Sequence, residues 1–289
     1  MTNTRIAFLL ATIAGCGPTF DPASLINTTR VLGARVEIEG APDRASPLPG
    51  ETADVTWLVT APDAVPPLGW AFTVCTTAAC EGGLLAQFEG TDSPPRLAIA
   101  VPSTDVLGSA TSLFVYGEIC DGVDSLPTFD RQSGVPGCSG EGTTVSLALA
   151  LQRGDEANHN PIADRAFTFD GQPWPAGDDP CSTGPRVSAG TKDHVLGTIA
   201  EGTDREPSTA MVGGVATPSR ESLQISQFTT AGKLASQFSF VEAADTSAET
   251  SLDVTWEAPV DAQAVTFTFV TRDNRGGTDW TTRAVCVEP

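Results

Sequence analysis

Residues 263–288 read QAVTFTFVTRDNRGGTDWTTRAVCVE, and they are the clearest indication of the fold class. Apolar Val265, Phe267 and Phe269 alternate with polar or other residues, which is the pattern of a β-strand with one buried face, and a second strand segment follows at 280–287. Between them lies Asn-Arg-Gly-Gly at 274–277, and glycines can adopt the positive φ angles that tight hairpin turns require. The stretch therefore predicts a β-hairpin.

The same alternation recurs through the rest of the chain. The clearest further cases are Val55-Trp57-Val59, Trp70-Phe72-Val74, Leu97-Ile99-Val101, Val145-Leu147-Leu149-Leu151 and Leu252-Val254-Trp256. Clusters of Pro, Gly, Asp and Ser separate these segments, at the spacing of a sandwich rather than of βαβ units. No long segment after the N-terminal region has the 3.6-residue period of a helix. We therefore expect an all-β protein.

A polar run at 155–161, DEANHNP, interrupts the strand pattern after Leu151. It predicts the boundary between two tandem immunoglobulin-like β-sandwich domains, at 30–152 and 161–289, each of the size typical of that fold. Residues 16–29 contain Pro18 and Pro22 among polar residues. They are predicted to form a short stalk before the first domain.

The N-terminal residues have the order of a secretory signal. A start containing Arg5 is followed by an apolar run at 6–13 and by small residues before Cys16, and the run is too short to span a bilayer. Residues 13–16, Ile-Ala-Gly-Cys, resemble the lipobox of bacterial lipoproteins, which implies a signal peptide at 1–15 and a lipid on Cys16. The alternative is an ordinary signal peptide with a cysteine at its end. Gly17 stands where an Asp retains enterobacterial-type lipoproteins at the inner membrane, so we expect a cell-envelope protein of the outer membrane.

The composition excludes some classes of partner. The chain has 16 Lys and Arg against 36 Asp and Glu, a formal net charge of −20, and such a chain repels nucleic acid. With 18% charged and 40% hydrophobic residues, it is not a charge-rich disordered tail and has enough apolar material for a core. We expect a folded protein with no nucleic-acid partner.

The cysteines indicate an oxidising compartment. Beyond Cys16 the chain has an even set of six, Cys75, Cys80, Cys120, Cys138, Cys181 and Cys286, which in an exported protein argues for disulfide bonds. Six cysteines allow fifteen pairings. Sequence order and the domain limits favour Cys75–Cys80, Cys120–Cys138 and Cys181–Cys286. A zinc site at Cys75 and Cys80 is the alternative, but it requires reduced thiolates.

Several short motifs carry a resemblance to a family. They are the lipobox, Ser24-Leu25-Ile26, Arg30-Val31-Leu32, Glu37, Pro49-Gly50-Glu51, Trp70 with Cys75, Asn158-His159-Asn160-Pro161, Asp204-Arg205-Glu206-Pro207 and RDNRGGTDW at 272–280. Together they resemble the predicted surface lipoproteins of myxobacterial type. The resemblance implies export, a lipid anchor and tandem immunoglobulin-like domains, and it implies no activity. The lengths between the motifs depart from the family, so properties of loops are not carried over.

Motifs for catalysis are missing from the sequence. It has no His-Glu-x-x-His, Gly-x-Ser-x-Gly, Walker loop or dinucleotide fingerprint, and its only histidines are His159 and His194. We interpret His159 as a polar residue of the interdomain turn and His194 as a loop residue that enters a strand. We therefore expect no enzyme. An envelope hydrolase remains an alternative, because the members of a catalytic triad meet only in space.

Two kinds of binding residue remain as candidates. Asp204, Glu206 and Asp273 are weak calcium candidates, because acidic motifs of cadherin-like repeats supply the oxygens that calcium needs. Solvated acidic loops are the simpler interpretation. Trp174, in the Pro-rich stretch GQPWP, is predicted to lie in a loop, and it is the tryptophan we would test as a ligand contact such as a sugar-stacking platform.

These observations lead to a functional expectation. We expect a lipid-anchored surface lipoprotein that acts as a binding, adhesion or structural module, with no cofactor and with an unidentified protein or glycan partner. A calcium-dependent cadherin-like adhesion module and an envelope hydrolase are the alternatives.

Overall fold

The computed structural model describes residues 21–130, 133–152, 157–177, 181 and 184–289, with the backbone alone at 210–212. The predicted signal peptide, lipobox and Cys16 therefore lie outside the described residues. Almost all regular structure is β-strand, so the all-β prediction is confirmed. No helix among the described residues is long and apolar enough to cross a membrane.

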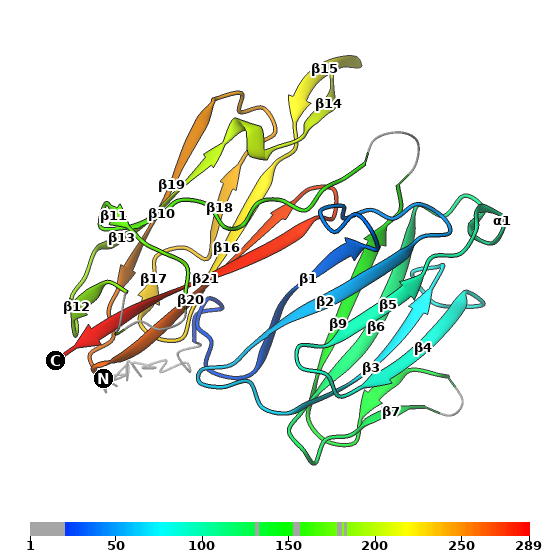
Figure 1. Cartoon of the computed structure of the whole chain (residues 1–289), viewed down its shortest axis with the longest axis horizontal. Helices are drawn as coiled ribbons and strands as arrows, with labels where there is room; N and C mark the ends of the chain where they lie inside the picture. Colours follow the sequence, from blue (N-terminus) through cyan, green and yellow to red (C-terminus); the bar gives the residue numbers. More distant parts are fainter. Residues whose placement is uncertain (1–20, 131–132, 153–156, 178–180, 182–183) are drawn as a thin grey trace, which may run out of the picture.

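Two sheets from the N-terminal part of the chain pack face to face (Figure 1). One has the order β1 (Arg30–Ile38), β2 (Thr52–Thr60), β5 (Arg96–Ala100), and the other β4 (Leu84–Gly90), β3 (Leu68–Cys75), β6 (Ser112–Asp121), β9 (Gly142–Ala150). The short elements α1 (Thr104–Leu107), β7 (Pro127–Phe129) and β8 (Pro136–Cys138) lie at their margins. Alternate residues of both sheets form one core, in which Trp57 stacks on Phe72 with ring centroids 4.2 Å apart.

Two further sheets follow in the C-terminal part of the chain. One has the order β11 (Gln172–Pro173), β10 (Phe167–Phe169), β13 (His194–Glu201), β19 (Glu249–Glu257), β17 (Lys233–Leu234), and the other β12 (Arg186–Ser188), β21 (Thr278–Glu288), β20 (Gln263–Asp273), β16 (Leu223–Thr229), β18 (Phe238–Val241). A 3₁₀ turn, η1 (Gly202–Asp204), leads to a separate ribbon of β14 (Pro207–Val212) and β15 (Val215–Arg220). The core between the two large sheets is rich in aromatic rings, with Trp174, Trp256 and Phe267 at its centre.

The predicted C-terminal hairpin is confirmed. Strands β20 and β21 pair from Gln263 opposite Val287 to Arg272 opposite Thr278, and Gly276 in the turn has a φ of 107°. The register points the side chains of Val265, Phe267 and Phe269 into the core, which is what their alternation predicts. We call the two pairs of sheets the first and the second sandwich; that each is an independent immunoglobulin-like domain stays a prediction.

The predicted stalk at 16–29 is wrong for its described part. Leu25 forms a parallel bridge with Thr229 of β16, and the amide of Ile26 donates to the carbonyl of Thr229 at 2.8 Å. Ile26 is 1% exposed and packs with Leu32, Phe228 and Val270 in a small core between the sandwiches. The apolar side chain of Ile26 explains the docking, because burial of its surface is favourable.

Candidate functional site

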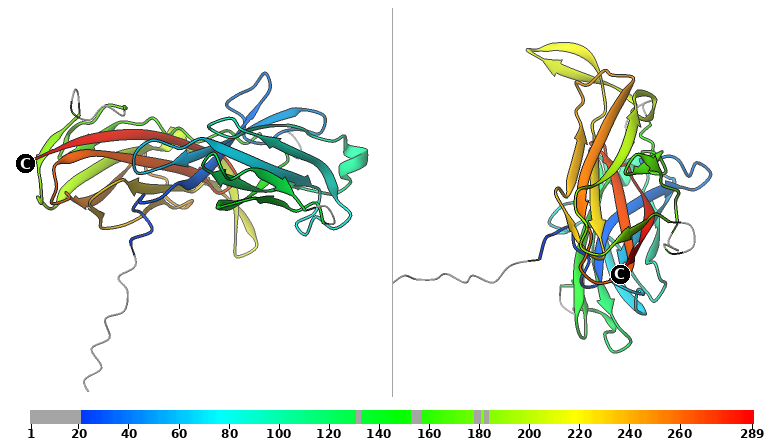
Figure 2. Two further views of the ribbon diagram at one scale, coloured as in Figure 1. Left: turned by 90° about the horizontal axis from the view of Figure 1, so that it is seen from below. Right: turned by 90° about the vertical axis from the view of Figure 1, so that its left-hand side faces the viewer.

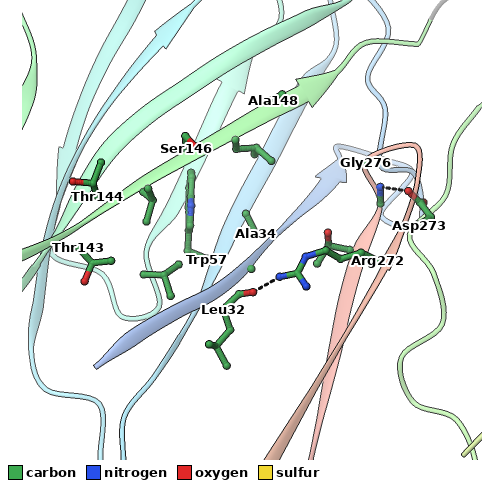
Figure 3. A pocket seen from close by; sticks show the side chains of 16 residues that line it. Leu32, Ala34, Trp57, Thr143, Thr144, Ser146, Ala148, Arg272, Asp273 and Gly276 are labelled. Carbon is green, nitrogen blue, oxygen red and sulfur yellow. Dashed lines mark hydrogen bonds between the residues drawn. The ribbon is translucent and has the colours of Figure 1, made fainter. Parts of the chain in front are cut away.

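A groove lies along the side of the first sandwich, between the edge strands β1 and β9 (Figure 3). It encloses about 400 Å³, within the range of ligand pockets. The indole of Trp57 forms part of its wall, beside Ala34 of β1 and the exposed Ser146 of β9. Because β1 and β9 are each the last strand of their sheet, the groove is bordered on both sides by strand edges without a further strand partner.

The turn of the second sandwich's hairpin closes one end of the groove. The guanidinium of Arg272 donates to the carbonyl of Leu32 and, at 2.9 Å, to the hydroxyl of Ser226. Burial lowers the pKa of Arg272, but a guanidinium remains charged in proteins. These contacts fix the end of β1 against β16 and β20, so the groove has walls from both sandwiches.

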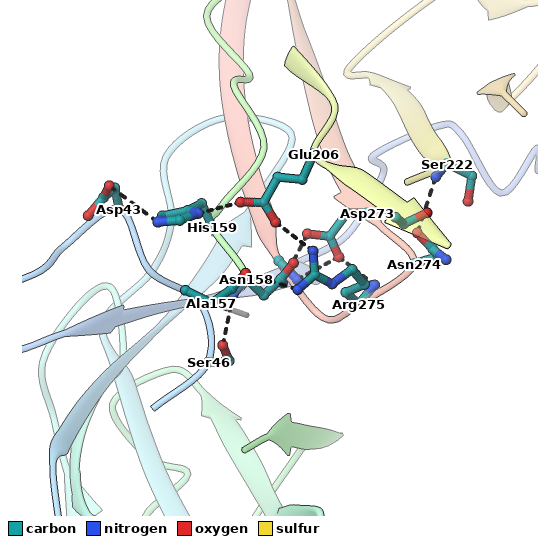
Figure 4. A network of polar contacts seen from close by, with 12 residues as sticks. Asp43, Ser46, Ala157, Asn158, His159, Glu206, Ser222, Asp273, Asn274 and Arg275 are labelled. Carbon is teal, nitrogen blue, oxygen red and sulfur yellow. Dashed lines mark hydrogen bonds and ion pairs between the residues drawn. The ribbon is translucent and has the colours of Figure 1, made fainter. Parts of the chain in front are cut away.

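A polar network joins three segments that are far apart in the sequence (Figure 4). The Asp273 carboxylate accepts hydrogen bonds from the amide of Gly277 at 2.8 Å and from the side chain of Asn158 at 3.1 Å. Glu206 binds Arg275 at 2.7 Å and the Nδ1 atom of His159. The three motifs Asn158-His159-Asn160-Pro161, Asp204-Arg205-Glu206-Pro207 and RDNRGGTDW therefore meet at the junction of the sandwiches.

The linker of this network is held on its other side by the first sandwich. The amide of Ala45 donates to the carbonyl of Asn158 at 2.8 Å, and the amide of Asn160 donates to the carbonyl of Asp43 at 2.7 Å. The amide of Asn158 itself donates to the hydroxyl of Ser46. His159 is thus part of a turn between the sandwiches, as we predict from the sequence.

A buried carboxyl lies beside this network. Glu221 is 1% exposed, and burial raises its pKa to about 7. That value also includes a hydrogen bond with the Glu206 backbone, which lowers the pKa, the carboxylates of Asp273 and Glu206, which raise it, and the Arg275 guanidinium, which lowers it. Burial likewise raises the pKa of Asp273, opposed by the amides that donate to it. No pattern in the sequence marks Glu221, which precedes β16 as an ordinary surface residue would.

The three weak calcium candidates are each engaged by other groups. Asp204 caps η1 and lies 3.6 Å from the buried guanidinium of Arg165, and Glu206 and Asp273 are engaged as described above. A carboxylate already paired with a cation or with amide donors has few lone pairs left for calcium. Among the described residues, no group of three or more His, Cys, Asp or Glu side chains could hold a metal ion.

Trp174 is a wrong prediction as an exposed ligand contact. Its ring is 2% exposed and lies edge-on to Phe267 and Phe169 in the core. Its indole nitrogen donates to the carbonyl of Ala284 at 3.0 Å. Part of the surrounding Pro-rich stretch is the short strand β11 and not the predicted loop, and the ring of Trp174 turns inward, where it cannot stack on a sugar.

His194 lies in a hydrogen-bonded row that resembles a triad in outline. Its Nδ1 is 2.8 Å from the Asp170 carboxylate, and its Nε2 is 2.7 Å from the hydroxyl of Thr191. That hydroxyl also contacts the carbonyl of Ser188 at 2.6 Å, and His194 stacks on Phe169. Nucleophilic catalysis needs a hydroxyl that opens on a cleft, and Thr191 does not line the groove between β1 and β9. We interpret these hydrogen bonds as contacts that stabilise the turn before β13.

The six cysteines pair as predicted. The Cα atoms are 5.2 Å apart in Cys75–Cys80, 5.5 Å in Cys120–Cys138 and 4.9 Å in Cys181–Cys286, within the range of disulfides. The zinc alternative at the first pair is therefore excluded in this structure. The third disulfide ties Cys181, after the loop of Trp174, to the end of β21.

A second hollow of about 540 Å³ lies beside the first disulfide. Tyr116, Leu84 and Val135 line it, and the Tyr116 hydroxyl already donates to the carbonyl of Ala78. The groove between β1 and β9 differs from it in having strand edges on both sides and walls from both sandwiches. We therefore take the groove as the candidate site.

Comparisons with known proteins add little to this geometry. No protein-family model and no curated protein matches the chain. Among solved structures, the transglutaminase of red sea bream is similar over 90% of this chain, with 8% identity and a TM-score of 0.27. The chain spans 32% of that enzyme's length. A likeness this low carries no argument about fold or activity.

Proposed function

We propose that this chain is a lipid-anchored protein of the bacterial cell envelope that acts as a binding module and not as an enzyme. Its ligand in this proposal is an extended peptide segment of another envelope protein. The observation that carries the proposal is the groove between β1 and β9, because strand edges border it on both sides.

The chemistry of the groove suits an extended peptide. Strand edges can add a peptide through main-chain hydrogen bonds, while pockets take alternate side chains. Hydroxyl groups of Thr144 and Ser146 on β9 can form further hydrogen bonds, and the largely buried indole of Trp57 contributes an apolar part of the wall. Among the described residues that line the groove, the one cationic side chain is Arg272, at the end of the groove. The middle of the groove therefore offers no positive charge to an anionic ligand.

The junction supports a rigid module. Contacts of 157–160 with both sandwiches, the Arg35–Asp279 ion pair and the apolar cluster at Ile26 all act across it. Rigid walls reduce the conformational entropy that the protein loses when a ligand binds. The three disulfides are consistent with an oxidising compartment.

The anchor is tested by metabolic labelling with an alkyne fatty acid. We expect the probe on the wild-type chain and no label on the Cys16→Ala variant, which should leave the membrane fraction. A wild-type chain without label, or a Cys16→Ala chain labelled equally, would refute the anchor.

The groove is tested with a random peptide library against the purified full chain. Ser146→Arg introduces a long side chain into the groove, and we expect it to abolish the binding of selected peptides. The matched control is Ser219→Arg on the distant ribbon, which should bind as the wild type does. Selected peptides that bind both variants equally would place the ligand elsewhere, and proteolysis patterns establish that both variants fold.

A further inference from the structure

An exposed aromatic pair lies on an edge strand of the second sandwich. Phe238 is 41% exposed and Phe240 is 54% exposed, with ring centroids 6.2 Å apart. Their strand, β18, is the last of its sheet, where only β16 pairs with it. An exposed edge with apolar side chains favours association unless something covers it.

A second exposed apolar feature is the ribbon of β14 and β15. Residues 207–219 read PSTAMVGGVATPS and contain no charged residue. Gly213 and Gly214 have φ angles of 59° and 83° at the tip, as a two-residue hairpin turn requires. The ribbon forms a sheet of its own and projects from the body (Figure 2), and Val215 near its tip is 66% exposed.

These two features are continuous with the start of the described chain. The side chain of Gln237, just before β18, donates to the carbonyl of Ala23 at 3.5 Å. Just after β18, the carbonyl of Ala243 accepts from the amide of Arg220, at the base of the ribbon. Strand β18 therefore runs from the N-terminal segment to the ribbon, and in the left panel of Figure 2 the dark blue start of the described chain and the ribbon both lie on the lower side.

The length of the chain before this segment limits how far a lipid can be. Four residues lie between Cys16 and Asp21, which makes five steps along the chain, and a fully extended chain of five steps spans at most about 18 Å. A bilayer that holds a lipid on Cys16 is therefore close to the face that carries Phe238, Phe240 and Val215.

We propose that Phe238, Phe240 and the ribbon tip at 210–216 form a membrane-facing surface that rests on the headgroup region of the bilayer, an inference that relies on the proposed lipid anchor. Phenyl rings and an uncharged tip suit that boundary region. The ribbon and the N-terminal segment then act as two separate supports, which fix the orientation of the groove relative to the membrane. Glu242 directly follows β18, and the chain has a net charge of −20. The contact therefore weakens as anionic lipid is added.

The experiment uses the acylated full chain, reconstituted in phosphatidylcholine vesicles that contain a photoactivatable phosphatidylcholine. After irradiation, mass spectrometry maps the lipid adducts and also reads the acylation of Cys16. We expect adducts on the peptides with 207–219 and 237–241, and none on the peptide with Val106 of α1. Val106 is an exposed residue on the first sandwich, away from this surface.

Two variants and a matched control sharpen the result. Val215→Asp should reduce adducts at the ribbon, Phe240→Ser should reduce them at β18, and Val106→Asp should change neither. Near-ultraviolet circular dichroism verifies folding. An acylated chain whose adducts lie elsewhere, or that has none, overturns the membrane-facing surface and leaves the anchor intact. A chain without lipid on Cys16 overturns the proposed anchor and this inference with it.

Discussion

Arg35 of β1 and Asp279 of β21 form an ion pair of 2.7 Å, between strands of different sandwiches. The other carboxylate oxygen of Asp279 accepts the amide of Ala163 in the linker. One carboxylate thus contacts the first sandwich, the linker and the second sandwich. The relative orientation of the sandwiches depends on contacts of this kind.

Asp279→Asn should weaken the junction. The side chains of the pair are 30% and 20% exposed, so solvent screens their attraction and we expect a loss of about 1 kcal/mol in the free energy of unfolding. Limited proteolysis within 157–165 should accelerate in the variant. Glu288→Gln, which breaks the exposed pair with Arg186, is the matched control and should leave cleavage of the linker unchanged. Equal cleavage in both variants would mean that Asp279 does not hold the junction.

Glu221 should make stability fall as the pH rises. Its pKa is 4.5 when unperturbed and about 7 in the folded protein, so the folded state binds more protons than the unfolded state between these values. The contribution of Glu221 to the free energy of unfolding is then fully present below pH 4.5 and is lost as the pH rises to about 7. The loss is on the order of 3 kcal/mol.

Glu221→Gln removes this titration. Urea unfolding should show the variant to be more stable than the wild type at pH 8 and similar to it near pH 4. Glu81→Gln, at an exposed position, is the control for the loss of one negative charge. A difference between wild type and Glu221→Gln that stays constant with pH would contradict the raised pKa.

The disulfides should contribute unequally. Cys181–Cys286 spans 105 residues of sequence and Cys75–Cys80 spans 5. In the chain-entropy model, the longer loop stabilises by about 5 kcal/mol and the shorter by about 2 kcal/mol. Double Cys→Ser variants of each pair, unfolded in urea without reductant, should preserve that order. A larger loss from the short loop would show that strain or packing at Cys75 outweighs loop entropy.

Local patterns explain what the sequence could predict. Alternation along 265–271 needs only the period of a strand, and the three cysteine pairs follow from their order along the chain. The burial of Trp174 could not be predicted in this way, because its neighbours Phe169 and Phe267 come from strands that only long-range pairing brings together. The burial of Ile26 could not be predicted for the same reason, since its partner Phe228 lies in the other half of the sequence.

The junction shows the same limit for the candidate site. Asn158 and Asp273 were both visible as members of short motifs, but they are 115 residues apart in the sequence. No period or spacing connects them. The acidic residues there suggested calcium because their cationic partners, Arg275 and Arg165, become neighbours only in the folded chain. Composition predicted charge at this point, and only topology determines which charges meet.

Gly277 should be more sensitive to substitution than its position in a turn suggests. The φ angle of Gly277 is not positive, but a Cβ atom at this position would lie 2.2 Å from the carboxylate of Asp273 and 2.8 Å from the carbonyl of His159. Gly277→Ala therefore has to displace backbone of the linker. We expect a loss of about 1–3 kcal/mol, as for overpacking, and faster proteolysis at the linker.

Gly213→Ala on the ribbon provides the comparison. Gly213 has a φ of 59°, and a Cβ there would meet nothing within 4 Å, so its cost is backbone strain of about 1–2 kcal/mol, confined to the tip. Hydrogen exchange should then rise at 157–160 in Gly277→Ala and remain unchanged there in Gly213→Ala. Equal exchange at the linker in the two variants would mean that close packing of Gly277 against Asp273 and His159 does not hold the sandwiches together.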